Sequence, residues 1–176
     1  MSKIQVVIGA CPSGYDARAL AVAQHSILAH TDAEVEFIVR GDNTGSTGFS
    51  SVRWSLRNLD GFAIYLDCDV LFFDDIEEIY DLRESNLWLG CVSNGRDTAM
   101  PGVVDCANMP KVNSLVDLKA ASYYTRGIPE YWNHCDRFDG FTKMLHFTQQ
   151  NRQPWKALAP KDRAIDKLWL DYEAAM

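Results

Sequence analysis

Apolar residues occur along the chain in short blocks, and the spacing within each block predicts either a buried strand or an amphipathic helix. Residues 4–10, IQVVIGA, form a continuous β-branched run that is typical of a buried parallel strand. Residues 16–30 carry apolar side chains at helical spacing behind Asp16, which is a suitable N-cap. The same criteria predict further strands at 35–40, within 62–72, and at 87–92, 102–109 and 141–148, and further helices at 52–59, 74–83, 111–124 and 161–174.

The alternation of these predicted strands and helices indicates an α/β protein with a mostly parallel central sheet. Residues 41–51 form a loop rich in Gly, Ser and Thr, which we interpret either as a lid or as an ordinary surface loop. Residues 125–140 are expected to form a second loop, rich in aromatic and polar groups. No repeat or linker interrupts the pattern, so we expect residues 1–176 to form a single compact domain.

Composition and charge narrow the possible functions. A content of 47% hydrophobic and 23% charged residues is ordinary for a globular protein, and the net charge of -7 argues against a nucleic-acid binder. The sequence has no apolar run long enough for a membrane span and no pattern of a signal peptide. The five cysteines are irregularly spaced without a C-x-x-C pair, so we expect reduced thiols in a cytoplasmic protein and no structural zinc site.

The most informative motif is YLDCDVLFF, residues 65–73, in which Asp67 and Asp69 directly follow an apolar strand. Side chains two positions apart on a strand face the same way, so the two carboxylates repel each other unless a proton or a cation lies between them. Cys68 should point to the opposite face and pack as a small hydrophobic residue. Ligands of open α/β sheets bind beyond the carboxyl ends of the strands, which is where this acidic pair lies.

The residues alone leave three interpretations of the acidic pair open. The two carboxylates could be chance neighbours at a strand end. They could belong to a phosphatase resembling the haloacid dehalogenases, with the first Asp as nucleophile and the second as acid/base. That family's motif normally ends the first strand, however, and its second acidic pair would have to be Asp136 and Asp139. Third, a divalent cation between the carboxylates could hold the diphosphate leaving group of a nucleotide sugar.

A second motif, MLHFTQQNRQPWK at residues 144–156, places an apolar strand ending in His146 before a Pro-Trp-Lys sequence. Together with FAIYLDCDVLFFDDIEEIYDL, it resembles the retaining glycosyltransferases of the family that includes glycogenin and bacterial lipopolysaccharide galactosyltransferases, glycosyltransferase family 8. The resemblance covers residues 3–10, 52–92 and 141–172. It implies the GT-A, Rossmann-like fold of nucleotide-diphospho-sugar transferases, in a shortened form.

The resemblance also implies an activity and a metal centre. Asp67, Asp69 and His146 would bind Mn²⁺, or Mg²⁺, because carboxylate oxygens suit both ions and an imidazole nitrogen favours Mn²⁺. The enzyme would transfer a hexose from a UDP-sugar to a hydroxyl of a glycan, lipid-linked or protein acceptor, with retention of configuration. Part of the acceptor region between residues 109 and 140 is shorter than in the family, so a non-catalytic sugar-nucleotide-binding module remains an alternative.

Further positions are implied for the donor and the acceptor. Arg53 would lie near the nucleotide or on a solvated helix face, and Tyr15 would stack on the base or pack internally. Arg152 or Lys156 would supply positive charge for the diphosphate, because Gln153 precedes Pro154 where the family has a lysine. Ile8, Gly9 and Ala10 are candidates for the nucleoside pocket. Asp105 is a candidate catalytic residue, and Asp105 or Asn108 could contact the sugar or the acceptor. The aromatic residues of the second half would form either an acceptor cleft or a packed face of the sheet: Tyr123, Tyr124, Tyr131, Trp132, Phe138 and Phe141.

Overall fold

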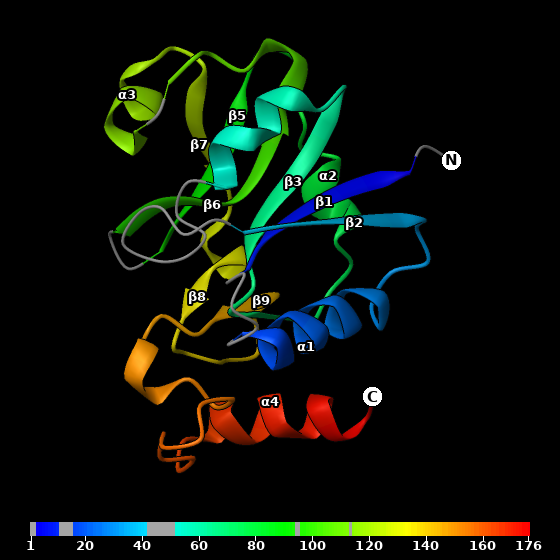
Figure 1. Ribbon diagram of the computed structural model, residues 1–176, viewed down its shortest axis with the longest axis vertical. Helices are drawn as coiled ribbons and strands as arrows, with labels where there is room; N and C mark the ends of the chain where they lie inside the picture. The colour runs from blue at the N-terminus through cyan, green and yellow to red at the C-terminus, as the bar shows by residue number, and fades with distance from the viewer. Residues whose placement is uncertain (1–2, 11–15, 42–51, 94–95, 113) are drawn as a thin grey trace.

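Two β-sheets and the helices around them form the framework of the protein (Figure 1). The structure is a computed structural model that describes residues 3–10, 16–41, 52–93, 96–112 and 114–176. The larger sheet has six strands in the order β2-β1-β3-β6-β5-β7. They are β1 (Ile4–Gly9), β2 (Val35–Arg40), β3 (Phe62–Asp67), β5 (Trp88–Ser93), β6 (Arg96–Asp105) and β7 (Tyr124–Ile128).

The larger sheet is mixed, which corrects the expectation of a mostly parallel sheet. β1 runs parallel to β2 and β3, and β5 runs parallel to β7, whereas β6 is antiparallel to both β3 and β5. The reason is the connection between β5 and β6. Because β5 ends at Ser93 and β6 begins at Arg96, the link is too short for the crossover that parallel strands require.

The smaller sheet has three strands in the order β4-β9-β8, with β9 antiparallel to β4 and parallel to β8. Its strands are β4 (Val70–Phe72), β8 (His134–Cys135) and β9 (Met144–His146). The helices are α1 (Ala17–Leu28), α2 (Glu77–Tyr80), α3 (Leu115–Ala120) and α4 (Ala164–Ala174), and the 3-10 turns are η1 (Val52–Asn58), η2 (Cys106–Asn108), η3 (Glu130–Trp132) and η4 (Gln150–Arg152).

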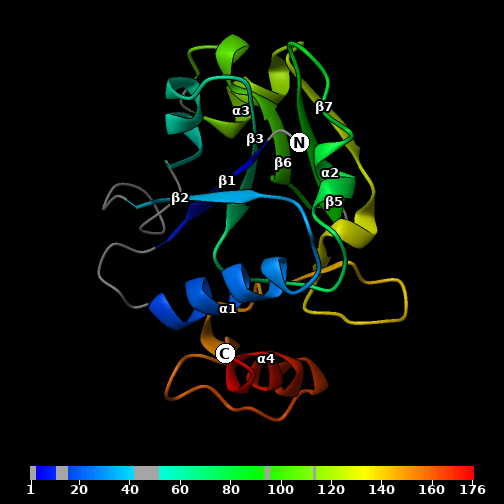
Figure 2. The same cartoon turned by 90° about the vertical axis from the view of Figure 1, so that its right-hand side faces the viewer.

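The C-terminal helix α4 lies beside α1 at one end of the molecule, as two perpendicular views show (Figures 1 and 2). Arg18 on α1 forms a bidentate ion pair with Glu173 on α4, with both nitrogen–oxygen distances at 2.6 Å. Asp16 lies at the N-cap position of α1 but makes no capping bond, because its carboxylate accepts the indole N–H of Trp155 at 3.3 Å. These contacts fix the last quarter of the chain against α1.

Several predicted elements differ from the structure. The helix expected at 52–59 is the 3-10 turn η1, and the helix expected at 74–83 is confined to α2. The strand expected within 62–72 is divided by a bend at Cys68 and Asp69, so its two parts, β3 and β4, belong to different sheets. The helix expected at 111–124 is confined to α3, and the loop expected at 125–140 contains most of β7 together with η3 and β8. Of the loop at 41–51, all but residue 41 lies outside the described residues.

The aromatic residues of the second half divide between packing and exposure. Trp132 is buried and packs against Phe72 of the smaller sheet with ring centres 6.0 Å apart. Tyr123 is also buried, whereas Phe138 and Phe141 are exposed. Trp132 and Tyr123 therefore pack inside the protein, which agrees with the interpretation of these aromatic residues as a packed face rather than an acceptor cleft. Over the residues that the structure describes, no helix is both long and apolar enough to span a membrane.

Candidate functional site

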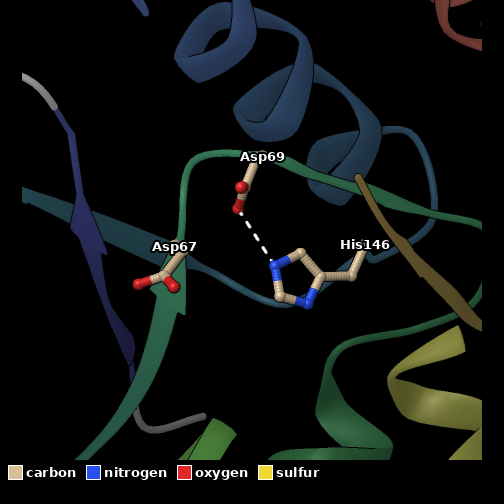
Figure 3. A group of neighbouring side chains, drawn as sticks. All are labelled: Asp67, Asp69 and His146. Atoms are coloured by element: carbon tan, nitrogen blue, oxygen red, sulfur yellow. Dashed lines mark ion pairs between the residues drawn. The ribbon is translucent and has the colours of Figure 1, made fainter. Parts of the chain in front are cut away.

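The side chains of Asp67, Asp69 and His146 converge where the two sheets meet (Figure 3). Asp67 is the last residue of β3, Asp69 lies in the bend after it, and His146 is the last residue of β9. One ligand atom from each residue lies within 4.8 Å of the other two. Because β9 pairs with β4 immediately after the bend, with His146 opposite Val70, residues nearly eighty positions apart in sequence become neighbours.

The hydrogen bonds of His146 determine which ring nitrogen faces the two carboxylates. The fully buried Asn133 donates its amide N–H to the carbonyl of Met100 at 2.7 Å, which fixes the orientation of the amide. Its Oδ1 therefore faces Nδ1 of His146 at 3.0 Å and accepts a hydrogen bond from the Nδ1–H. Nε2 of His146 consequently points toward Asp69, with Oδ1 of that carboxylate 3.3 Å away.

The Asp69 carboxylate is almost enclosed by protein, with 9% of the residue exposed. Its Oδ2 accepts a hydrogen bond from the amide of Gln153 at 3.2 Å. Its Oδ1 is buried and has no hydrogen-bond donor of good geometry among the described residues. An ionised oxygen that is buried in this way is costly unless a cation occupies the adjacent space.

Asp67 is supported from the strand that carries it. The hydroxyl of Tyr65, two residues earlier and on the same face, donates to Asp67 Oδ1 at 2.7 Å. The guanidinium of Arg53 lies over the Tyr65 ring, 5.2 Å from its centre, and is itself buried. Arg53 thus places a positive charge beside the acidic pair and does not lie on a solvated helix face. Its position near a nucleotide stays a prediction.

The electrostatics of the group favour a bound positive charge. Burial raises the pKa of Asp67, and repulsion from the Asp69 carboxylate raises it further. Burial opposes a charge on His146, but attraction to the Asp69 and Asp67 carboxylates outweighs this effect and raises its pKa to about 10. The two carboxylates therefore favour the cationic form of the imidazole.

The three side chains fit a divalent cation. Such ions bind oxygen and nitrogen ligands at about 2.0–2.6 Å, so two ligands on opposite sides of one ion lie at most about 5 Å apart. The spread of 4.8 Å among the ligand atoms is within this limit. The unshared Asp69 Oδ1 and the Nε2 of His146 are the two atoms that the surrounding hydrogen bonds leave available.

Cys68, between the two aspartates, is buried and packs as a small hydrophobic residue, as the sequence predicted. It is 1% exposed, its N–H donates to the carbonyl of Gly9 at 3.0 Å, and burial raises the pKa of its thiol far above the ordinary value. The thiol therefore packs as a small apolar group and stays protonated. This hydrogen bond also ties the bend to the end of β1.

The residues expected to form the nucleoside pocket have different surroundings. Gly9 pairs with Asp67 across β1 and β3, so it lies at the edge of the site. Ala10 follows it, with its N–H bonded to the carbonyl of Arg40. Ile8 is completely buried in the core, so its side chain is not at a surface. Tyr15 lies outside the described residues.

Two of the basic side chains that were candidates for the diphosphate make contacts elsewhere. The amine of Lys156 donates to the backbone carbonyl of Gln150, and the guanidinium of Arg152 pairs with Asp162. Gln153, between them in sequence, is the residue whose side chain reaches the acidic pair.

Asp105 is not brought to this site. It lies opposite Phe62, at the amino end of β3, whereas Asp67 lies at the carboxyl end of the same strand. Its Oδ2 accepts the backbone N–H of Asn86 at 2.7 Å and the side-chain amide of Asn108 at 2.9 Å. These bonds give both Asp105 and Asn108 a structural role at the far end of the sheet.

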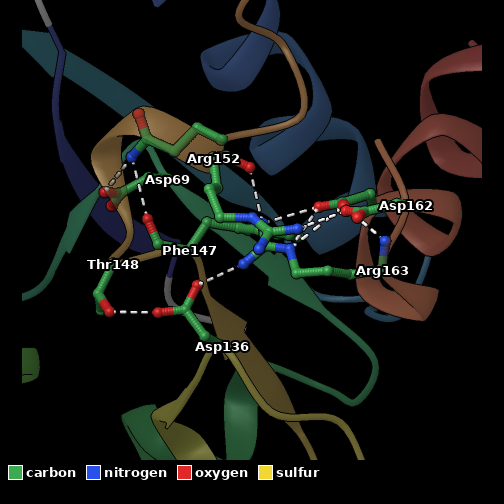
Figure 4. A network of polar contacts seen from close by, with 9 residues as sticks. Asp69, Asp136, Phe147, Thr148, Arg152, Asp162 and Arg163 are labelled. Atoms are coloured by element: carbon green, nitrogen blue, oxygen red, sulfur yellow. Dashed lines mark hydrogen bonds and ion pairs between the residues drawn. The ribbon is translucent and has the colours of Figure 1, made fainter. Parts of the chain in front are cut away.

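A network of polar contacts surrounds the segment that leaves β9 (Figure 4). The carboxylate of Asp136 accepts the hydroxyl of Thr148 and pairs with Arg163 at 3.3 Å. Arg163 also donates to the carbonyl of Arg152 at 2.7 Å and binds Asp166 on α4. The network joins β8, the exit of β9, η4 and α4, and so it fixes the backbone that carries His146.

Comparison with known proteins identifies the fold. No protein-family model matches the chain, and no curated protein sequence matches it. Among solved structures, the apo form of the glycosyltransferase GlyE from Streptococcus pneumoniae TIGR4 is similar, with a TM-score of 0.73 and 12% identity over 98% of this chain. This chain spans 60% of the length of GlyE.

Two further glycosyltransferases show the same similarity. The galactosyltransferase LgtC, in complex with donor and acceptor sugar analogues, has a TM-score of 0.72 and 12% identity, over 98% of this chain and 96% of LgtC. The bifunctional glycosyltransferase WbbM has a TM-score of 0.69 and 13% identity, over 98% of this chain and 50% of WbbM. The chain therefore has the GT-A glycosyltransferase fold, with an Asp-x-Asp and histidine group suited to a metal ion.

Three residues that support the group escaped prediction: Tyr65, Asn133 and Gln153. Tyr65 could have been found, because it shares a strand face with Asp67 two residues later. Gln153 was visible only as a departure from the family's lysine. Asn133 gave no signal, because it lies in a segment that was expected to be a loop and becomes a neighbour of His146 only through the pairing of β8 with β9.

Proposed function

We propose that the protein is a metal-dependent glycosyltransferase that transfers a hexose from a UDP-sugar to the hydroxyl of a glycan, lipid-linked or protein acceptor, with retention of configuration. The observation that carries this proposal is the convergence of Asp67, Asp69 and His146 where β3 and β9 end, on a glycosyltransferase fold. Mn²⁺ suits two carboxylates and an imidazole, and Mg²⁺ is the alternative ion.

A divalent cation, if bound by Asp67, Asp69 and His146, would supply positive charge for a nucleoside diphosphate leaving group. The chain's own residues prepare the site for that role. Tyr65 holds one oxygen of Asp67, and Asn133 directs Nε2 of His146 toward the carboxylates. Arg53 adds a buried positive charge next to Tyr65, which favours the binding of an anionic group.

The end of β1 is the edge of the metal group at which the donor would approach. Gly9 lies directly beside Asp67 and has no side chain, so a ligand can approach the backbone there. Its carbonyl is already used by Cys68, which keeps this edge rigid.

The phosphatase interpretation lacks its second acidic pair. Asp136 binds Thr148 and Arg163, and Asp139 accepts the backbone N–H of Phe141 within its own turn. Neither carboxylate belongs to the group formed by Asp67, Asp69 and His146. We therefore carry the transferase forward and retain the non-catalytic sugar-nucleotide-binding module as the alternative that the assays must exclude.

The proposal is tested first by binding. A ligand that binds only the folded state at 100 times its Kd stabilises the protein by about 2.7 kcal/mol. For a chain of this size, that corresponds to a rise in melting temperature of about 5–11 °C. We expect UDP plus Mn²⁺ to produce such a rise, and a chelator to abolish it.

The matched variants are Asp67→Asn and His146→Ala, with Asp171→Asn on the exposed face of α4 as the control. The first two should lose the Mn²⁺-dependent rise and the control should retain it. Retention of the rise by both site variants would show that the ligand assignment is wrong.

A panel of UDP-sugars, scored for Mn²⁺-dependent release of UDP in the presence of screened acceptors, then separates an enzyme from a binding module. A UDP-sugar carries no phosphomonoester group, so the phosphatase is tested in a parallel assay with p-nitrophenyl phosphate. Release of inorganic phosphate in that assay would support the phosphatase.

A further inference from the structure

Gln153 lies between the two segments that carry Asp69 and His146. Its Nε2 donates to Asp69 Oδ2 at 3.2 Å and to the backbone carbonyl of Phe147 at 2.9 Å, two acceptors that Figure 4 shows side by side. An amide nitrogen has two hydrogens, so each segment receives one. The residue is 5% exposed, and water therefore does not compete for these bonds.

This bridge controls the orientation of the Asp69 carboxylate. The backbone N–H of Phe147 already donates to the backbone carbonyl of Asp69 at 2.9 Å, so the main chains of the two segments are joined without Gln153. What Gln153 adds is a donor to one oxygen of the side chain. With Oδ2 held, Oδ1 faces Nε2 of His146 at 3.3 Å and remains available.

Gln153 is itself held firmly. The carbonyl of Arg152 before it accepts a hydrogen bond from Arg163, and Trp155 after it packs against Phe147 with ring centres 5.9 Å apart. The indole N–H of Trp155 is bound to Asp16 at the start of α1. The glutamine is therefore presented from a fixed backbone, and its amide has little freedom to follow a rotating carboxylate.

We infer that Gln153 is a positioning residue of the metal centre, which sets the direction of the Asp69 carboxylate and thereby the affinity for a divalent cation. The inference rests on the proposed metal-dependent function. Hydrogen bonds that orient metal ligands typically change metal affinity by about 10–100-fold when they are removed. The cause here is that an Asp69 side chain without its donor can rotate Oδ1 away from the position shared with Asp67 and His146.

The test is a calorimetric titration of the full chain with Mn²⁺ alone, without nucleotide. Gln153→Met keeps the length and volume of the side chain and removes both donors. The matched control is Gln5→Met, because Gln5 also donates to a backbone carbonyl, that of Asp60 at 2.9 Å, at the opposite end of β3. We expect Mn²⁺ to bind Gln153→Met at least about 10-fold more weakly than the unaltered protein, and Gln5→Met to match the unaltered protein.

The outcomes separate this inference from the proposed function. If the unaltered protein binds Mn²⁺ and Gln153→Met binds equally well, the positioning role is overturned and the metal centre stands. If the unaltered protein does not bind Mn²⁺, the metal centre is overturned and the inference with it.

A second variant covers the case in which Gln153→Met does not fold, as judged by circular dichroism. Gln153→Asn keeps a buried amide but is one methylene shorter, so it cannot reach both acceptors. We expect at least a 10-fold loss of affinity here as well, and an affinity equal to that of the unaltered protein would overturn the inference.

Discussion

Replacing Asp105 by alanine tests whether this carboxylate holds the far end of the sheet or takes part in the candidate site. The residue is 4% exposed, and its Oδ2 accepts the N–H of Asn86 and the amide of Asn108. Asn86 has a positive φ of 61°, which is uncommon for a residue other than glycine. The bond from its N–H to Asp105 therefore also stabilises a strained turn before β5.

The expected cost follows from these two bonds. A hydrogen bond to a charged group contributes about 1.5–3 kcal/mol, and the bond from the exposed Asn108 contributes less because water can replace it. We expect Asp105→Ala to reduce the free energy of unfolding by about 2–4 kcal/mol. That loss lowers the melting temperature by about 4–16 °C for a chain of this length. Asp105→Asn, which keeps an acceptor but no charge, should lose about half as much.

The pH dependence gives an independent check. Burial works against the charge of Asp105, but the hydrogen bonds from Asn86 and Asn108 outweigh it, and the pKa of the carboxyl is lowered. A group whose pKa is lower in the folded state stabilises the fold above its unfolded pKa, about 3.9, and loses this effect as the pH falls through the folded value. The difference in unfolding free energy between Asp105→Ala and the unaltered protein should therefore be largest at pH 7 and become smaller below about pH 4.

The assay is urea denaturation at pH 7 and pH 3.5, combined with Mn²⁺ titration of the folded variant. Because Asp105 lies at the opposite end of β3 from Asp67, the Mn²⁺ affinity should not change. A variant with the stability of the unaltered protein would refute the hydrogen-bond argument. A variant of unchanged stability that no longer binds UDP with Mn²⁺ would instead return Asp105 to the active site.

Two further substitutions test packing and the support of the acidic pair. At Gly102, an added Cβ would lie 2.4 Å from the indole nitrogen of Trp88, so Gly102→Ala should cost about 1–3 kcal/mol of unfolding free energy in a urea titration, whereas Gly140→Ala, with nothing within 4 Å, should be neutral. Equal stability of the two variants would contradict this steric argument. Tyr65→Phe removes the donor to Asp67, and we expect about 10-fold weaker Mn²⁺ binding in calorimetry. Unchanged Mn²⁺ affinity would show that the Tyr65 hydroxyl does not support the metal centre.

The strands of the larger sheet were predictable where the sequence is continuously apolar. β1 and β2 occupy the ranges that were expected within one residue. For β1 the reason is that a buried β-branched run has few other stable conformations. β2 is a half-exposed strand at the edge of the sheet, and its apolar Val, Phe and Ile residues were sufficient for the prediction. The C-terminal helix was likewise anticipated by the helical spacing of Ile165 and Trp169, both of which are buried.

The division of strands between the two sheets was not predictable. Nothing in the apolar run of residues 62–72 shows that β3 pairs with β1 while β4 pairs with β9, because pairing partners are a tertiary property. The same limit hid β7, whose residues are mostly exposed at the edge of the larger sheet and therefore lack an apolar pattern.

For the candidate site, the sequence predicted the potential metal ligands, two carboxylates and a histidine. It did not predict the residues that orient them. Asp67, Asp69 and His146 are grouped as the motif predicted. The amides of Asn133 and Gln153 carry no charge and have no characteristic spacing, so only the folded chain reveals that they support the group.

The bend at Cys68 and Asp69 makes the candidate site a seam between two independent sheets. Asp67 belongs to the first sheet and His146 to the second, so the distance between them records how closely the two halves of the fold are joined. An ion bound by residues of both sheets would hold the two sheets together. Loss of the ion would weaken the contact between the sheets without unfolding either one. Binding of the ion would therefore stabilise the contact between the ends of β3 and β9, in addition to the contacts that already hold the C-terminal part of the chain.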